Sequence, residues 1–335
     1  MATILGIEST AHTFGIGIVK DKKILSNVKK SYSTADGEGG MIPIEVAKFH
    51  SENKKEVYLN ALKNAGISED KIDAIAFSQG PGLAPCLLEG MKFTKELSTK
   101  LNKPVIPVNH CIAHLEIGQI TGAKDPVMLY VSGANTQVIA YSSGKYRIFG
   151  ETLDIGAGNF IDTFARYAGI GFPAGPRIEE LAKKSKNYIE LPYTVKGMDI
   201  ALSGILTNLK NKVESPEYKI DDLAYSMQET VFAMLVEISE RALAHVNKNE
   251  LLLGGGVACN KRLQEMCKNM CKERIGKTKT KFFCPENSLL VDNGAMIAFL
   301  GEIMFNNRVK FSYKELDKID IKPRQRTDEV NVLWK

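Results

Sequence analysis

Apolar residues at the start of the chain fall into three short runs that predict three β-strands. The runs are TILGIE (residues 3–8), FGIGIVK (14–20) and ILSNVKKSY (24–32), and the polar segments STAHT and DKK separate them. Short β-branched or alternating runs between polar turns are typical of paired strands. The pattern therefore predicts a strand–turn–strand–turn–strand unit.

Residues 126–153 repeat this unit with a different sequence, in which SSGK forms the second turn. Helical segments are predicted after each copy, over 44–66 and 89–102 after the first and over 157–168, 176–186 and 221–247 after the second. Further strand-like runs lie at 72–80, 104–108 and 250–256. Alternating strands and helices predict an α/β architecture, and the repetition predicts two similar domains that face each other.

A duplicated hairpin unit is a known way to hold a nucleotide, because each turn offers backbone N–H groups and hydroxyls to phosphates. LLLGGGVACN (251–260) adds the glycine-rich turn that such a site requires. We therefore predict an α/β protein with the actin-like ATPase (ASKHA) fold, in which two duplicated RNase H-like domains surround a nucleotide cleft. The predicted parts are an N-terminal lobe (1–125), a C-terminal lobe with nucleotide-binding elements (126–290), and a helix and tail (291–335) that pack back on the N-terminal lobe.

Two of the five histidines, His110 and His114, are four residues apart in VNHCIAHLEIG. On a helix this spacing places both side chains on one face, where they can share a metal ion. Cys111 follows the first histidine, whereas metalloproteases of the H-E-x-x-H kind need a glutamate there. A carboxylate commonly completes such a site. Asp292 in LLVDNGAMIA is the best candidate, and its alternative role is that of a helix N-cap.

Two acidic residues leave two interpretations open. Asp162 and Arg166 are four apart on a predicted helix and could form a surface ion pair. Glu179 is expected in the first turn of the helix that Pro176 opens, where an acid interacts favourably with the helix dipole. Alternatively, Glu179 and Gly175 contact ribose hydroxyls.

The composition fits a cytoplasmic globular protein. The 335 residues are 44% hydrophobic and 25% charged with a net charge of +5, a mild excess that permits a nucleic-acid partner without requiring one. No apolar run is long enough to cross a membrane, the N-terminus lacks the basic region of a signal peptide, and the six cysteines show no disulfide framework. We expect free thiols in a reducing compartment.

Basic residues cluster at 261–281 and in KPRQR (322–326). Each cluster is either a solvated surface or a contact for nucleic-acid phosphates, for which affinity comes from released counterions. The charges alone do not choose between the two.

Ten motifs follow one another along the chain: ILGIESTAHT, GGMIP, QGPGL, NHCIAHLEIG, LYVSGANTQVIAY, FGETLDIGAGNFIDTFAR, PAGPRIEELA, LPYTVKGMDIALSG, GGGVACN and VDNGAMIA. In this order they resemble the TsaD-type tRNA threonylcarbamoyl-transferases over essentially the whole chain. YTVKGMDIALSG and the final RQRTDEV look like the archaeal and eukaryotic form, which is the catalytic subunit of the KEOPS complex.

The resemblance implies a set of site residues. The metal ligands would be His110, His114 and Asp292, with Tyr130 as a weaker contact. Threonylcarbamoyl-adenylate would be held by the loop Tyr130, Val131, Ser132, Gly133 and Ala134, and its ribose and adenine by Asp162, Gly175, Glu179 and Asn260. The catalytic residue is unknown. Glu8 lies near the first phosphate turn in the superfamily layout and is either a base or structural.

The resemblance also implies the reaction. The threonylcarbamoyl group would pass from the adenylate, which a separate synthase makes, to the exocyclic amine of the adenosine 3′ of the anticodon in tRNAs reading codons that begin with A. Each subunit would use one divalent metal, Fe²⁺ or Zn²⁺, with ATP or the adenylate as nucleotide ligand. The partners would be tRNA and the other KEOPS subunits, namely a small kinase/ATPase, a small dimerising subunit and additional small subunits, with no membrane involved. The chain carries no H-R-D or D-F-G kinase signature, so that kinase is expected to be separate.

Three motifs depart from the family pattern. SGAN replaces SGGN, and Ala134 narrows the allowed backbone angles. GGMIP replaces GGIHP, so Ile42 stands where the family has a histidine, and AGPR replaces GGPK through Ala174 and Arg177. None of these changes touches the implied metal ligands.

Other functions make different demands on the sequence. A sugar-kinase-like, ATP-dependent phosphotransferase of the same superfamily would use the two phosphate turns, but it typically carries aspartate where this chain has Glu8, and it has no place for a histidine pair. A metalloprotease is supported by the histidine pair alone. A non-enzymatic scaffold would bind a nucleotide and transfer nothing to tRNA.

Overall fold

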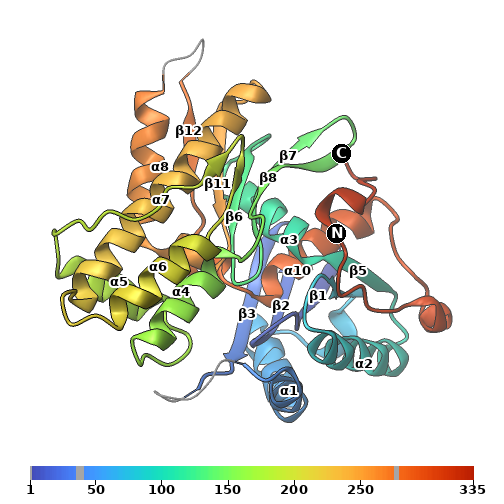
Figure 1. The fold of residues 1–335 in the computed structure, drawn as a ribbon. Coiled ribbons are helices and arrows are strands. Elements are labelled where there is room, and N and C mark those ends of the chain that lie inside the picture. Colours follow the sequence, from blue (N-terminus) through green and yellow to red (C-terminus); the bar gives the residue numbers. More distant parts are fainter. Residues whose placement is uncertain (1, 35–40, 275–278) are drawn as a thin grey trace.

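The computed structural model describes residues 2–34, 41–274 and 279–335, and two mixed five-stranded sheets form its framework (Figure 1). The first sheet has the order β3-β2-β1-β4-β5. Its strands are β1 (Thr3–Glu8), β2 (Thr13–Lys20), β3 (Lys23–Ser31), β4 (Ala74–Gly80) and β5 (Val105–Asn109). The first three strands pair antiparallel as the sequence predicts, and β4 and β5 continue the sheet in parallel with β1.

The second sheet repeats this arrangement, with the order β12-β11-β6-β7-β8. Its strands are β6 (Val127–Val131), β7 (Thr136–Ser142), β8 (Lys145–Glu151), β11 (Glu250–Gly254) and β12 (Lys281–Phe283). Three antiparallel strands again adjoin two parallel ones. The predicted duplication is therefore confirmed. The small hairpin of β9 (Val195–Lys196) and β10 (Asp199–Ile200) was not predicted from the pattern.

Helices cover the outer face of each sheet and fill the space between the two sheets (Figure 1). Outside the first sheet lie α1 (Pro43–Ala65) and α2 (Ala84–Leu101). Outside the second lie α4 (Ala157–Tyr167), α5 (Gly175–Lys183), α6 (Ser203–Val213), α7 (Ile220–His245) and α8 (Lys261–Glu273). Between the sheets lie α3 (His110–Glu116) and α10 (Gly294–Asn306), and the short α9 (Asn287–Leu290) precedes α10. The five helices predicted from periodicity are present, whereas α6 was not predicted.

The backbone of α10 rests directly on the first sheet. A Cβ atom at Gly6 would lie 2.2 Å from the backbone nitrogen of Ala298, and one at Gly17 would lie 2.2 Å from that of Ala295. Any side chain at these two strand positions would push the helix away, so the close approach requires glycine. Asp292 lies two residues before α10, and its position is therefore fixed relative to β1 and β2.

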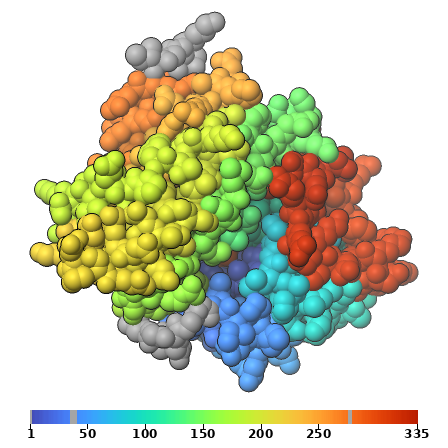
Figure 2. All heavy atoms as spheres, viewed as in Figure 1, coloured from blue at the N-terminus to red at the C-terminus, as the bar shows by residue number. Residues whose placement is uncertain are grey.

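The chain after α10 returns along the edge of the first sheet and reaches the second. Phe311 exchanges two backbone hydrogen bonds with Val105 of β5, at 2.8 and 2.9 Å. Further on, Arg326 forms an ion pair of 3.0 Å with Glu151 of β8. Figure 2 shows the surface hollowed between the yellow-to-green residues and the blue-to-cyan ones, with dark-blue N-terminal residues at the bottom. The division of the chain at residues 125 and 290 stays a prediction.

The cysteines and the helices agree with two expectations from composition. All six cysteines are free, and Cys86, Cys111, Cys267 and Cys271 are buried. Within the described ranges, every helix is too short or too polar to cross a membrane.

Candidate metal centre

Both histidines of the candidate site lie on α3, directly after β5. Asn109 ends β5 and caps the helix, because its side-chain oxygen accepts a hydrogen bond of 3.1 Å from the backbone N–H of Ile112. The cap starts the helix at His110 and places His114 one turn later on the same face. The two imidazole rings meet edge to face with centroids 4.7 Å apart, and both are buried.

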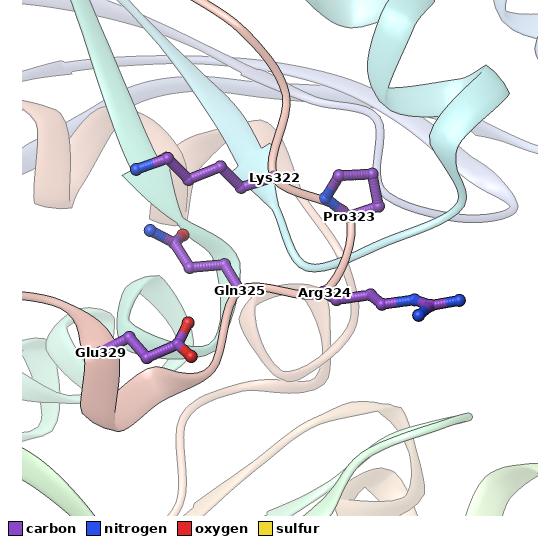
Figure 3. A pocket seen from close by; sticks show the side chains of 5 residues that line it. All are labelled: Lys322, Pro323, Arg324, Gln325 and Glu329. Atoms are coloured by element: carbon purple, nitrogen blue, oxygen red, sulfur yellow. The ribbon is translucent and has the colours of Figure 1, made fainter.

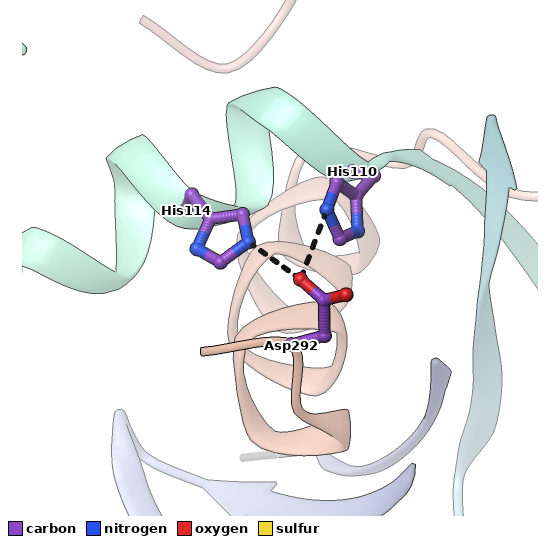
Figure 4. Close-up of side chains that lie close together, drawn as sticks. All are labelled: His110, His114 and Asp292. Atoms are coloured by element: carbon purple, nitrogen blue, oxygen red, sulfur yellow. Dashed lines mark hydrogen bonds and ion pairs between the residues drawn. The ribbon is translucent and has the colours of Figure 1, made fainter. Parts of the chain in front are cut away.

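Asp292 reaches the same point from the segment before α10. Its Oδ1 atom lies 3.4 Å from Nε2 of His110 and 3.4 Å from Nε2 of His114 (Figure 4). The alternative role of Asp292 as a helix cap is wrong, because Asn293 caps α10 by accepting a hydrogen bond from the N–H of Met296. The neighbouring asparagine thus leaves the aspartate free to face the histidines.

The three side chains fit a divalent cation. Their ligand atoms all lie within 4.8 Å of one another. A tetrahedral site with metal–ligand bonds of about 2.1 Å separates its ligand atoms by about 3.4 Å, which matches both distances to Asp292. Two imidazoles and one carboxylate suit Zn²⁺ or Fe²⁺, and three protein ligands leave a position open, as catalytic sites require.

Tyr130, near the end of β6, approaches the three side chains from the second sheet. Its ring lies 5.0 Å from that of His114. Its hydroxyl is buried, and no residue that the structure describes hydrogen-bonds to it. A buried hydroxyl without a partner is costly, and a cation or ligand at the open position would relieve that cost.

Glu8, at the end of β1, orients His110 from behind. Its Oε2 accepts a hydrogen bond of 2.9 Å from Nδ1 of His110. Its Oε1 accepts two more from Thr10, 2.7 Å from the backbone N–H and 2.6 Å from the hydroxyl. A carboxylate on the far nitrogen of a metal-binding histidine fixes the tautomer and aims the other nitrogen. The geometry therefore favours a positioning role for this buried glutamate.

The ionisable groups of this site shift one another's pKa values. Burial alone would lower the pKa of His110, but the carboxylates of Glu8 and Asp292 outweigh it and raise that pKa well above its usual value. Burial lowers the pKa of His114, which Asp292 only partly opposes. Burial would raise the pKa of Asp292, but His110 and His114 hold it well below its usual range. A bound cation would replace the proton that His110 otherwise carries.

The loop after β6 presents backbone donors to solvent. The carbonyl oxygens of Ser132 and Gly133 accept hydrogen bonds of 2.9 Å from the N–H groups of Gly158 and Asn159 in the first turn of α4. These two N–H groups of α4 therefore already have acceptors within the protein and are not free for a ligand. Gly133 and Ala134 are exposed residues whose N–H groups find no acceptor in the described part of the chain, so these groups remain available to a phosphate.

Asp162 and Gly175 lie on either side of one turn. Oδ1 of Asp162 accepts a hydrogen bond of 3.0 Å from the backbone N–H of Ala174, the residue before α5. This contact, rather than an ion pair with Arg166, holds the carboxylate, and burial raises the pKa of Asp162. A Cβ atom on Gly175 would meet nothing within 4 Å, so this backbone position faces open space.

Glu179 and Asn260 adjoin each other at the start of α8. Since α5 begins at Gly175, Glu179 lies in its second turn, and the first-turn expectation is wrong. Oε1 of Glu179 instead accepts a hydrogen bond of 3.2 Å from the N–H of Lys261. Asn260 caps α8 and donates from Nδ2 to Gln228 over 2.9 Å. Across the described residues, no hydrogen bond or ion pair joins Asp162, Glu179 or Asn260 to the group of His110, His114 and Asp292.

Lys29 is a neighbour of the candidate metal site that the sequence patterns did not reveal. Its Nζ donates to the backbone oxygen of Asp292 over 3.4 Å, and burial lowers its pKa. The adjacent Lys30 points to the opposite face of β3 and pairs with Glu56 at 2.6 Å. Successive side chains of a strand point to opposite faces of the sheet. Two consecutive lysines in a strand therefore indicate that one of them faces inward.

The departures from the family motifs lie away from this cluster. Ala134 is not among the described residues with positive φ, so its methyl group carries no backbone strain there. Ile42 precedes α1 and is 54% exposed, while both glycines of GGMIP lie outside the described residues. Ala174 is buried at the start of α5.

Comparison with known proteins decides the family. The sequence model described as TsaD, tRNA N6-adenosine threonylcarbamoyltransferase, matches residues 23–299. The chain belongs to this family. It is 53% identical over 330 residues to the tRNA N6-adenosine threonylcarbamoyltransferase of Thermococcus kodakarensis, covering 98% of this chain and 99% of that protein. It is 49% identical to a probable bifunctional tRNA threonylcarbamoyladenosine biosynthesis protein of Methanocaldococcus jannaschii, covering 98% of this chain and 60% of that protein.

Membership of the TsaD family confirms the resemblance that the ten motifs carry. Among solved structures, T. kodakarensis HypF is similar to this chain with a TM-score of 0.62 at 15% identity, over 91% of this chain and 48% of that one. At this identity the likeness shows the fold alone. Together with the two repeated sheets, it confirms the predicted α/β actin-like ATPase fold.

Proposed function

We propose that this TsaD family member transfers the threonylcarbamoyl group from threonylcarbamoyl-adenylate to the exocyclic amine of the adenosine 3′ of the anticodon, in tRNAs that read codons beginning with A. The high identity to transferases of that name supports the reaction class. The single structural observation that carries the proposal is the convergence of His110, His114 and Asp292 on one point between the sheets.

The proposed reaction exchanges one bond for another. The lone pair of the adenosine amine forms a bond to the carbamoyl carbon, and the bond from that carbon to the phosphate oxygen breaks. AMP leaves with the electron pair, and the amine loses one proton. The anhydride is already activated but the arylamine is a weak nucleophile, so orientation and stabilisation of the developing negative charge are what the protein must supply.

The candidate residues divide these tasks. His110, His114 and Asp292, with the hydroxyl of Tyr130 beside them, would hold Fe²⁺ or Zn²⁺, and the bound cation supplies positive charge to an oxygen of the donor. Glu8 keeps His110 aimed at the cation. In the loop Tyr130, Val131, Ser132, Gly133 and Ala134, the free N–H groups of Gly133 and Ala134 would donate to the phosphate. Asp162, Gly175, Glu179 and Asn260 would border the ribose and adenine.

We also propose partners and a location for this reaction. tRNA would be the acceptor, and the KEOPS subunits, a small kinase/ATPase and a small dimerising protein among them, would bind this chain in the cytoplasm. The M. jannaschii relative is named as probably bifunctional, and this chain covers 60% of it. Its remaining part supports the proposal that a second protein works together with this chain. Free cysteines are compatible with a reducing compartment.

Reconstitution tests the proposal. The chain is incubated with threonine, bicarbonate, ATP, the adenylate synthase and unmodified tRNA, with and without the partner subunits, and the nucleosides of the digested tRNA are analysed. We expect threonylcarbamoyl-adenosine from the wild type and none from the double variant His110→Ala, His114→Ala. Modification at the wild-type rate by a folded double variant would show the metal role to be wrong, and transfer to no tRNA under any of these conditions would refute the function.

A further inference from the structure

A segment of the C-terminal tail, residues 322–329, is held against the start of the histidine helix. The backbone N–H of Lys322 donates to the carbonyl of Gln79 over 2.8 Å, and the carbonyl of Pro323 accepts from Gly82 over 3.1 Å. The side chain of Gln325 accepts a hydrogen bond of 3.1 Å from Asn109, the cap of α3. The segment therefore has a defined position, one residue away from His110.

The cations of this segment differ in what they contact. Arg326 is neutralised by Glu151 at 3.0 Å and by Asp328 at 3.2 Å. Lys322 and Arg324 are exposed, and their charged groups meet no carboxylate or other hydrogen-bond partner in residues 2–34, 41–274 or 279–335. Figure 3 shows the two side chains extending to opposite sides of the segment. One arginine thus joins the two sheets, whereas two neighbouring cations are left free for an external anion.

The same segment lines a hollow of about 520 Å³. Its walls are formed by Lys322, Pro323, Arg324, Gln325 and Glu329. Glu329 uses one carboxylate oxygen to accept from the N–H of Arg326 over 3.1 Å, and the amide of Gln325 points into the same region (Figure 3). An exposed segment with a free cation on each side suits the phosphates of an RNA strand better than it suits an apolar peptide.

We propose that residues 322–329 bind the RNA backbone next to the acceptor adenosine, with Lys322 and Arg324 each contacting one phosphate. This inference rests on the proposed function, because it takes tRNA as the ligand. The acceptor base must reach the cation held by α3, and the free cations lie on the segment bound to the cap of that helix. Each phosphate contact releases counterions, so each contributes about 0.7–0.9 to the slope of log affinity against log salt concentration.

Binding of unmodified tRNA transcript to the full-length chain, measured between 50 and 200 mM KCl, tests the proposal. The double variant Lys322→Ala, Arg324→Ala is expected to bind roughly tenfold more weakly at the lower salt, with a slope smaller by about 1.5. AMP affinity and metal content should be unchanged. Under turnover, KM for tRNA should rise while kcat stays near that of the wild type.

A charge-matched control separates a local contact from a change in net charge. Lys71 and Lys318 are exposed, and each already pairs with a carboxylate, at 3.1 and 2.8 Å. The double variant Lys71→Ala, Lys318→Ala removes the same two charges and should change tRNA affinity less than twofold. Equal losses in the two double variants, an unchanged salt slope, or a wild type that binds no tRNA at 50 mM KCl would overturn the proposal. Normal tRNA binding by a wild type that transfers nothing would instead refute the proposed function and leave the binding segment standing.

Discussion

The carboxylate of Glu8 accepts a hydrogen bond of 2.9 Å from Nδ1 of His110, although 102 residues separate them in the chain. The contact joins the end of β1 to the start of α3 and directs Nε2 of His110 toward Asp292. Glu8, which could have been a base, thus lies behind a candidate metal ligand and orients its imidazole.

Replacing Glu8 by glutamine tests this orienting role. Glu8→Gln keeps the shape but removes the charge that favours the correct tautomer, and loss of such a partner typically weakens metal binding by about 10–100-fold. Metal affinity, measured by competition with a chromophoric chelator, should fall by that factor. Glu116→Gln is the control, because Glu116 is equally buried on α3 but bonds to Tyr146 and Trp334. Wild-type metal affinity in Glu8→Gln would contradict the assignment.

Lys29 should contribute to the binding of AMP but not to the binding of adenosine, which lacks the phosphate. Its ammonium lies beside Asp292 with one backbone oxygen as partner, so an anionic ligand would find spare donors there. Lys29→Met should weaken AMP binding about tenfold or more and leave adenosine binding unchanged, as read by calorimetry. Lys30→Met, in which the lost lysine pairs with Glu56 on the other face of β3, should alter neither. Equal losses of affinity for AMP and adenosine would show that Lys29 does not bind the phosphate.

Acid should destabilise the protein partly through His50. This histidine is fully buried beside Phe14, and burial lowers its pKa to about 4. The unfolded chain therefore binds a proton near pH 6.5 that the folded chain refuses, so stability is lost as pH falls below that value. The loss between pH 7 and pH 5 should be about 2 kcal/mol.

Urea unfolding at the two pH values measures this loss in the wild type and in His50→Leu. The variant should lose about 2 kcal/mol less than the wild type over the same interval. His245→Gln, which alters an exposed histidine, serves as the control and should follow the wild type. Parallel pH profiles for all three proteins would exclude His50 as the source.

Gly156, beside the loop after β6, and Gly175, at the start of α5, should respond differently to substitution by alanine. A Cβ atom at Gly156 would lie 2.4 Å from the backbone oxygen of Ala134, whereas one at Gly175 meets nothing within 4 Å. Gly156→Ala should lower the thermal midpoint and displace the loop. Gly175→Ala should leave stability unchanged, yet it should weaken AMP binding if the ribose lies against this position. Normal AMP binding by Gly175→Ala would remove Gly175 from the proposed site.

The local patterns predicted the repeated sheets and the main helices, because alternation and helical spacing record which face of each element is buried. The pair His110 and His114 was recognisable for the same reason. Their third partner was harder to assign, since Asp292 and Asn293 are both good caps and only the tertiary structure shows that the asparagine caps the helix.

Contacts between distant segments were beyond the pattern. Nothing local links Glu8 to His110 or Gln325 to Asn109, because the first pair forms only when the ends of β1 and β5 meet, and the second only when the C-terminal tail folds back onto β5. The start of α5 was misjudged by a smaller error: the helix begins at Gly175, which moves Glu179 out of the first turn.

The direct seating of α10 on the glycines of β1 and β2 has a mechanical consequence. The two histidines follow β5 of the first sheet. Asp292 precedes α10, whose backbone lies so close to the backbone of β1 and β2 that the helix cannot slide unless the strands move. All three groups are therefore positioned by segments attached to the first sheet, whereas Tyr130 and its loop are positioned by β6 of the second. Opening or closing the two halves would leave the histidine–aspartate triangle intact and would change only how near the hydroxyl and the loop amides stand to it.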